Sequence, residues 1–180
     1  LNLTNRYLET DSNNAGAWRL RGRIYRLLNE PHHAVDDLQR SKSLSANPAV
    51  SIELATVFSE MGQMDAAIGE LVNASQQPQA PMQIRLLLEL FYQRSNRLSD
   101  LERFYTRMLE RYPDSPFWSI RAGQFYLSKK DTAQAVKYFR QAWEIHRQQD
   151  TNDPITFNLY LEALNQNKQY AEAINTATPW

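Results

Sequence analysis

The chain has 180 residues, 42% of them apolar, which is enough for one domain with a sizeable core or for a short array of stacked units. Twenty basic and twenty acidic residues give a net charge of zero, so the overall charge does not favour binding to nucleic acid or to an anionic membrane. The lack of cysteine excludes disulfides, thiolate metal sites and a cysteine nucleophile, and it leaves the compartment open between cytoplasm and periplasm.

Helical signals follow one another along the whole chain. In residues 17–30, apolar residues recur at helical spacing. Five prolines stand where helices can begin, because the first helical turn does not need the N–H that proline lacks: Pro31, Pro48, Pro81, Pro116 and Pro154. Asp131 is expected to cap the next helix, and Ser99 with Glu102 has the pattern of a capping box. No apolar run approaches the ~20 residues of a membrane span. We therefore expect a soluble, all-α protein without membrane insertion.

Small residues recur in pairs along these predicted helices. Gly22, which is costly inside a helix, is followed by Ala34 twelve positions later. The same spacing separates two further pairs, Ala55 with Ala67 and Gly123 with Ala135. Units defined in this way begin near residues 15, 48, 82, 116 and 154. This period indicates a helical repeat array in which Gly22 and Ala34 face each other where two antiparallel helices cross.

The units resemble the tetratricopeptide repeat, a helix-turn-helix unit of 34 residues with aromatic, small and proline positions at set offsets. The first unit supplies Trp18, Gly22, Tyr25, Ala34, Leu38 and Ser41, and the fourth supplies Ala122, Gly123, Tyr126, Ala135, Phe139 and Ala142. The resemblance implies an all-α fold, an α-solenoid of such repeats that forms a right-handed superhelix. It divides the chain into the C-terminal helix of a preceding repeat, residues 1–14, and the repeats 15–47, 48–81, 82–115, 116–153 and an incomplete 154–180, all in one continuous solenoid domain.

Some positions depart from the repeat pattern. Arg21 occupies a position where leucine is usual, and Glu89 with Leu101 replaces the small pair of the third unit. The last interval is longer than the others, which predicts one extra helical turn within residues 143–154. Leu1 at the start and the incomplete repeat at the end predict a fragment of a longer array. Self-association could then occur through the apolar residues of its ends, Leu3, Tyr7, Leu8, Tyr160, Leu164 and Ile174.

The search for catalytic chemistry predicts neither an enzyme nor a bound cofactor or metal. His32 and His33 are interpreted as exposed turn residues, because adjacent residues do not converge on one metal. Asp36 and Asp37 are interpreted as surface acids of a first helical turn, and His146 as a residue at a helix C-terminus. No phosphate-binding loop, hydrolase triad or zinc motif is present in the sequence.

A solenoid of helix pairs lines its concave face with the first helix of each unit. In tetratricopeptide repeats, ligand contacts usually come from one side of that helix, and the resemblance transfers this role to fourteen residues. The predicted partner-binding groove consists of Arg19, Arg23, Arg26, Leu27, Ile52, Thr56, Leu86, Leu90, Gln93, Ile120, Gln124, Leu127, Asn158 and Glu162. Ordinary solvation of the arginines and inter-repeat packing of the apolar residues are the alternatives. Among the arginines, only Arg26 has an acid at helical spacing, Glu30.

The sequence therefore predicts a non-catalytic scaffold that binds a segment of another protein in its groove. The arginine row favours an acidic or amphipathic segment as the partner. The alternative is a regulatory or localising region of a larger enzyme, or of a secretion or polysaccharide-export assembly. RNA binding, known for helical arrays of similar period, is disfavoured because the chain has no continuous basic groove.

Overall fold

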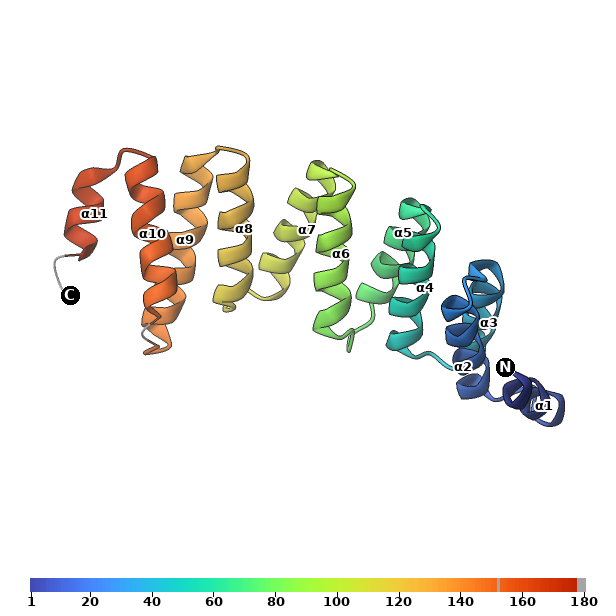
Figure 1. Cartoon of the computed structure of the whole chain (residues 1–180). Coiled ribbons are helices and arrows are strands. Elements are labelled where there is room, and N and C mark those ends of the chain that lie inside the picture. The colour runs from blue at the N-terminus through green and yellow to red at the C-terminus, as the bar shows by residue number, and fades with distance from the viewer. Residues whose placement is uncertain (152, 178–180) are drawn as a thin grey trace. The chain divides into compact units, whose positions relative to one another are not determined.

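The computed structural model describes residues 1–151 and 153–177, and these residues form eleven helices and no strand. The helices are α1 (Asn2–Thr10), α2 (Ala15–Leu27), α3 (Pro31–Leu44), α4 (Pro48–Glu60), α5 (Met64–Ser75), α6 (Met82–Arg94), α7 (Leu98–Arg111), α8 (Pro116–Ser128), α9 (Thr132–Gln148), α10 (Pro154–Gln166) and α11 (Tyr170–Ala177). They divide into an N-terminal unit, residues 1–98, and a C-terminal unit, residues 99–180. Within each unit, consecutive helices form antiparallel pairs (Figure 1).

The helix starts follow the proline and capping signals closely. Four prolines occupy the first turns of α3, α4, α8 and α10, whereas Pro81 is the residue just before α6. The predicted cap at Asp131 is confirmed, since its side chain accepts a hydrogen bond from the Gln134 N–H. The predicted capping box at Ser99 is wrong. The chain enters α7 already at Leu98, directly after a tight turn, so Ser99 lies inside the first helical turn.

One turn geometry closes every helix pair in the described residues. The N–H that follows the turn residue donates to the carbonyl five residues earlier, as from Glu30 to Tyr25 and from Arg97 to Tyr92. The turn residue itself has a positive φ between 54° and 75°, and the five turn residues are Asn29, Gly62, Asn96, Lys130 and Lys168. Each turn is three residues long, and within each unit it reverses the chain and sets the second helix against the first.

In the N-terminal unit, α2 crosses α3 and α4 crosses α5. A Cβ added to Gly22 would lie 3.0 Å from the Leu38 Cγ and 3.2 Å from the Ala34 carbonyl oxygen. The predicted close crossing of Gly22 and Ala34 is therefore confirmed, and bulk at this point would push the two helices apart. A core that includes Ala34, Leu38, Val50 and Leu54 joins the first pair to the second.

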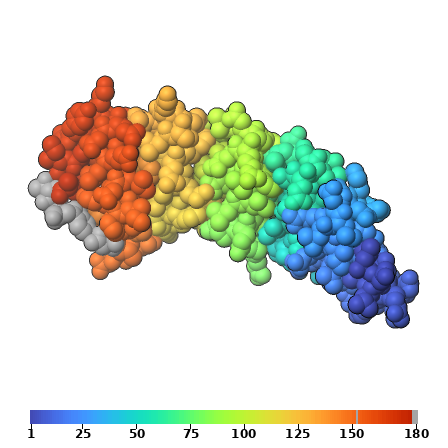
Figure 2. Space-filling model, viewed as in Figure 1, coloured from blue at the N-terminus to red at the C-terminus, as the bar shows by residue number. Residues whose placement is uncertain are grey.

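In the C-terminal unit, α8 crosses α9 by the same means. A Cβ on Gly123 would come within 2.8 Å of the Phe139 ring, and Trp118, Ala135 and Phe139 are buried around this crossing. With 17 residues, α9 is longer than the other described helices, which confirms the extra turn expected before residue 154. Figure 2 shows the surface of each unit, where side chains of successive helix pairs lie against one another.

Candidate interaction surface

The predicted groove residues of the N-terminal unit lie on α2, α4 and α6. We call their exposed side the first-helix face. On α2, Arg19, Arg23 and Arg26 succeed one another at helical spacing, so their side chains leave the same side of the helix. The neighbouring helix α4 presents two acids to them, Glu53 and Glu60.

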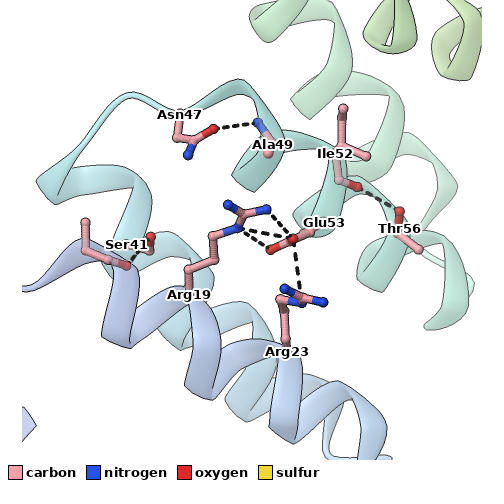
Figure 3. A network of polar contacts seen from close by, with 9 residues as sticks. Arg19, Arg23, Ser41, Asn47, Ala49, Ile52, Glu53 and Thr56 are labelled. Atoms are coloured by element: carbon pink, nitrogen blue, oxygen red, sulfur yellow. Dashed lines mark hydrogen bonds and ion pairs between the residues drawn. The ribbon is translucent and has the colours of Figure 1, made fainter. Parts of the chain in front are cut away.

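The Glu53 carboxylate is contacted by two arginine side chains of α2, Arg19 and Arg23 (Figure 3). The Arg19 Nη2 donates to the Glu53 Oε1 at 2.7 Å, and the Arg19 Nε lies 3.1 Å from Oε2. The Arg23 Nε lies 3.9 Å from Oε1, at the outer limit of an ion pair. The hydrogen bond that Arg19 donates to Glu53 raises the pKa of Arg19, and partial burial opposes this effect. Arg19 is therefore held by its own chain, whereas Arg23 is held weakly.

Arg26 forms the second contact between these helices. Its Nε donates to Glu60 at 2.8 Å, and this hydrogen bond lowers the pKa of the Glu60 carboxyl group. The predicted partner of Arg26, Glu30, is wrong. Because α2 ends at Leu27 and the chain then reverses at Asn29, Glu30 leaves the face and instead contacts the His33 Nδ1 at 3.0 Å.

These contacts belong to a wider charge pattern centred on residues 48–81. This segment holds four acids and no lysine or arginine, and each acid contacts a base from outside the segment. Besides the two pairs above, Lys42 contacts Glu70 at 2.6 Å and Arg97 contacts Asp65 at 2.9 Å. Arg19 and Glu53, like Arg26 and Glu60, are 34 residues apart. The charge pattern could have been read from the sequence as opposite charges one repeat period apart.

The remaining predicted residues of the first-helix face differ in exposure. The Arg23 side chain is 60% exposed and Leu27 is 84% exposed, while Leu90 and Gln93 on α6 are exposed as well. Ile52, Thr56 and Leu86 are half-buried, and the Thr56 hydroxyl donates to the Ile52 carbonyl. The accessible part of this face therefore combines one weakly held cation with apolar and amide side chains.

The C-terminal unit carries the other predicted residues on α8 and α10. Ile120 and Leu127 are half-buried, and Gln124 is exposed. On α10, Asn158 and Glu162 are exposed, and Glu162 accepts a hydrogen bond from Gln166 at 3.1 Å. This part of the surface is uncharged apart from Glu162.

Sequence reasoning missed a buried ion pair beside the first crossing. Arg21 binds Asp37 with two hydrogen bonds of 2.7 and 2.8 Å, and it also donates to Asn5 on α1 at 3.0 Å. Its guanidinium group lies 4.6 Å from the centre of the Trp18 ring. The interpretation of Asp37 as a surface acid is wrong, because its side chain is only 5% exposed. The sequence signal for this ion pair was Arg21 itself, which occupies a repeat position where leucine is usual.

The histidines and their surroundings give no arrangement for metal binding. His32 and His33 are exposed at the start of α3, as expected. His146 lies near the C-terminus of α9, where its Nδ1 is 2.8 Å from the Thr151 hydroxyl and its Nε2 is 3.5 Å from the Asp153 carboxylate. Over residues 1–151 and 153–177, no group of three or more His, Asp or Glu residues could hold a metal ion.

The sequence of this chain matches the model of a known protein family. The model described as Iml2/Tetratricopeptide repeat protein 39 matches residues 44–179. The chain belongs to this family. No curated protein matches the chain by sequence. Membership of the Iml2/Tetratricopeptide repeat protein 39 family confirms the resemblance to tetratricopeptide repeats, and the matched residues include Ala122, Gly123 and Ala135 of the fourth repeat.

Solved structures with the same fold are distant in sequence. The C-terminal part of a TPR repeat-containing protein from Cytophaga hutchinsonii has a TM-score of 0.66 at 15% identity, with 99% of this chain and 73% of that chain covered. MamA has a TM-score of 0.58 at 21% identity, covering 82% and 81%. YrrB, described as a TPR protein with an unusual peptide-binding site, has a TM-score of 0.54 at 20% identity, covering 92% and 80%. The all-α solenoid of tetratricopeptide repeats is thereby confirmed as the fold class.

Within the described residues, no helix combines the length and the apolar character needed to cross a lipid bilayer.

Proposed function

We propose that this chain is a non-catalytic scaffold that binds a segment of another protein on its first helices. The observation that carries the proposal is the accessible part of the first-helix face, where Arg23 and Leu27 project into solvent from α2. Membership of a tetratricopeptide family supports the proposal, as does the peptide-binding site named for the similar structure YrrB.

The charge pairs narrow the chemistry of the partner. Arg19 and Arg26 already donate to Glu53 and Glu60, so a partner carboxylate would compete with these acids for them. Arg23 has only a 3.9 Å contact and is the arginine best able to donate hydrogen bonds to a partner carboxylate. Leu27 and Leu90 provide exposed apolar surface on the same face. We therefore propose an amphipathic partner segment with at least one acid and several apolar residues.

A selection of random peptides displayed on phage tests this proposal. We expect the enriched peptides to combine acidic with apolar residues, and we expect Arg23→Glu to weaken them several-fold by placing like charges in contact. Arg40→Glu is the matched control, because Arg40 is exposed on α3, away from the first-helix face. Enriched peptides that bind both variants equally would exclude Arg23 from the binding site.

A salt titration with generic RNA separates this proposal from nucleic-acid binding. A neutral chain in which Arg19 and Arg26 are paired with acids should bind RNA weakly and without the steep salt dependence of phosphate contacts. Tight RNA binding that falls steeply with salt would overturn the assignment of protein as the partner.

A further inference from the structure

A hollow of about 500 Å³ lies in the N-terminal unit where the ends of α3 and α5 meet the start of α4. Its volume falls within the usual range of ligand pockets, which begins at ~300 Å³. Alanines and prolines form its apolar part. The polar lining consists of Lys42, Asn47, Ser51, Asn73, Gln77 and Gln79. The hollow is formed by helix ends and loops and includes none of the predicted groove residues.

Ser51 is the unusual member of this lining. The residue is only 4% exposed and its side chain makes no hydrogen bond within the described residues, but its hydroxyl keeps some contact with solvent, unlike the fully enclosed hydroxyl of Ser119. A serine in a helix commonly donates to a carbonyl one turn earlier, as Thr56 does to Ile52 on the same helix. A hydroxyl that has solvent access and no protein partner is satisfied by water, which a bound group would replace. The remaining access of Ser51 is to the hollow, so a group bound there could receive its hydrogen bond.

The other polar groups are uncharged or already neutralised. Lys42 donates to Glu70 at 2.6 Å, so the single cation of the lining is balanced by an acid of the same unit. The Asn47 side-chain oxygen accepts from the Ala49 N–H, which leaves the amide nitrogen of Asn47 available. Across the described residues, the side chains of Asn73, Gln77 and Gln79 make no hydrogen bond within the chain. The hollow therefore offers several free carboxamide donors and acceptors without net charge.

We propose that this hollow binds an extended, uncharged peptide segment, as a second binding site beyond the first-helix face. A carboxamide carries the same donor and acceptor as a peptide group, so it can pair with an extended backbone. The alanines and prolines can accept a small apolar side chain of that segment. None of the lining residues is aromatic, so the hollow lacks the flat apolar surface on which a sugar ring would pack.

The test uses the capped tetrapeptide acetyl-Ala-Leu-Ala-Gln-amide as probe and the ¹⁵N-labelled chain as target. We expect the peptide to shift the backbone amide of Ser51 and the side-chain amides of Asn73 and Gln77. Ser51→Ala should weaken the peptide about three- to tenfold, the effect of one lost hydrogen bond. The same substitution should leave the melting temperature unchanged or raise it, because the hydroxyl has no partner within the chain. Ser59→Ala, on the same helix but outside the hollow, is the control and should change neither.

Three results would overturn the proposal. The first is that the peptide shifts none of these groups at millimolar concentration. The second is that Ser51→Ala lowers the melting temperature and leaves peptide affinity intact, which would make the hydroxyl a structural group. The third is that maltotriose, added in place of the peptide, produces the same shifts, which would make the hollow a sugar site.

Discussion

Arg21 shows how a charged residue can occupy a repeat position that is usually apolar when its charge is paired. Its guanidinium group lies over the Trp18 ring and donates two hydrogen bonds to Asp37. The pairing keeps the pKa of Arg21 raised, chiefly through the hydrogen bond to Asp37. Arg21 also donates to Asn5, so one side chain joins α1, α2 and α3.

Removal of one partner should therefore cost more than removal of an exposed pair. Asp37→Asn leaves the half-buried Arg21 without its carboxylate, and we expect a loss of roughly 2–4 kcal/mol in the free energy of unfolding. Asp36→Asn, one residue away on the exposed side of α3, should change it by less than about 0.5 kcal/mol. Urea unfolding of the two variants measures both values. Equal effects would show that Asp37 is not a buried partner.

The left-handed turn residues offer a second test at this scale. Lys130 has a φ of 61°, a conformation that disfavours side chains with a Cβ, whereas Gly62 meets the same requirement at no such cost. Lys130→Gly should therefore stabilise the chain by about 0.5–1 kcal/mol, and Gly62→Ala should destabilise it by about 1 kcal/mol. Lys137→Gly, in the interior of α9, is the control and should destabilise by about 1 kcal/mol. Denaturant midpoints distinguish these signs.

At the scale of helices, the contact between α2 and α4 depends on charge as well as on packing. Arg26 and Glu60 form a simple pair, with side chains 40% and 47% exposed. Such exposed pairs contribute about 0.2–1 kcal/mol. Their main effect here is therefore to favour one neighbour and one alignment of the two helices over others.

A charge exchange measures this preference directly. Arg26→Glu and Glu60→Arg should each destabilise the chain by about 0.5–1 kcal/mol, because each places like charges opposite one another. The double variant should recover most of that loss. If the double variant is as unstable as the sum of the single variants, the two side chains do not interact in solution.

Most of the architecture was readable from sequence because helix starts and small crossing residues are local signals. Pro31, Pro48 and Asp131 mark helix starts through the backbone geometry and hydrogen bonds of the first helical turn itself. Gly22, a glycine inside a helix, indicated the point where a second helix approaches closely. The charge pairs were harder to predict. Arg26 contacts Glu60 rather than Glu30 because the contact depends on how the next helix pair stacks, which the spacing of charges within one helix does not specify; the repeat period of 34 residues does. The groove residues remain a prediction.

For the molecule as a whole, the paired carboxylates predict how stability depends on pH. Hydrogen bonds from Arg26 lower the pKa of Glu60, and those from Lys129 and Tyr126 lower the pKa of Glu102, both from an ordinary value of 4.5. A carboxyl group with a lowered pKa in the folded state stabilises that state above its ordinary pKa. This contribution is lost as the pH falls through the lowered value.

We therefore expect a constant melting temperature between about pH 6 and 7 and a decline below about pH 4.5. Glu102→Gln should make the decline shallower, because the amide cannot lose a charge. A thermal melt series in citrate and phosphate buffers measures both curves. A melting temperature that rises on acidification would contradict the assigned pairs.

The acidic segment 48–81 also restricts how such a chain can lengthen by duplication. A tandem copy of this segment alone would place the Glu53 of the new copy one period after the Glu53 of the old copy, so that only the old Glu53 would keep an arginine, Arg19, as its partner. Duplication of residues 15–81 together would instead repeat the order of base and acid, with Arg19 and Arg26 of the new copy beside the acids of the old. The unit of growth for this array would then be two repeats rather than one.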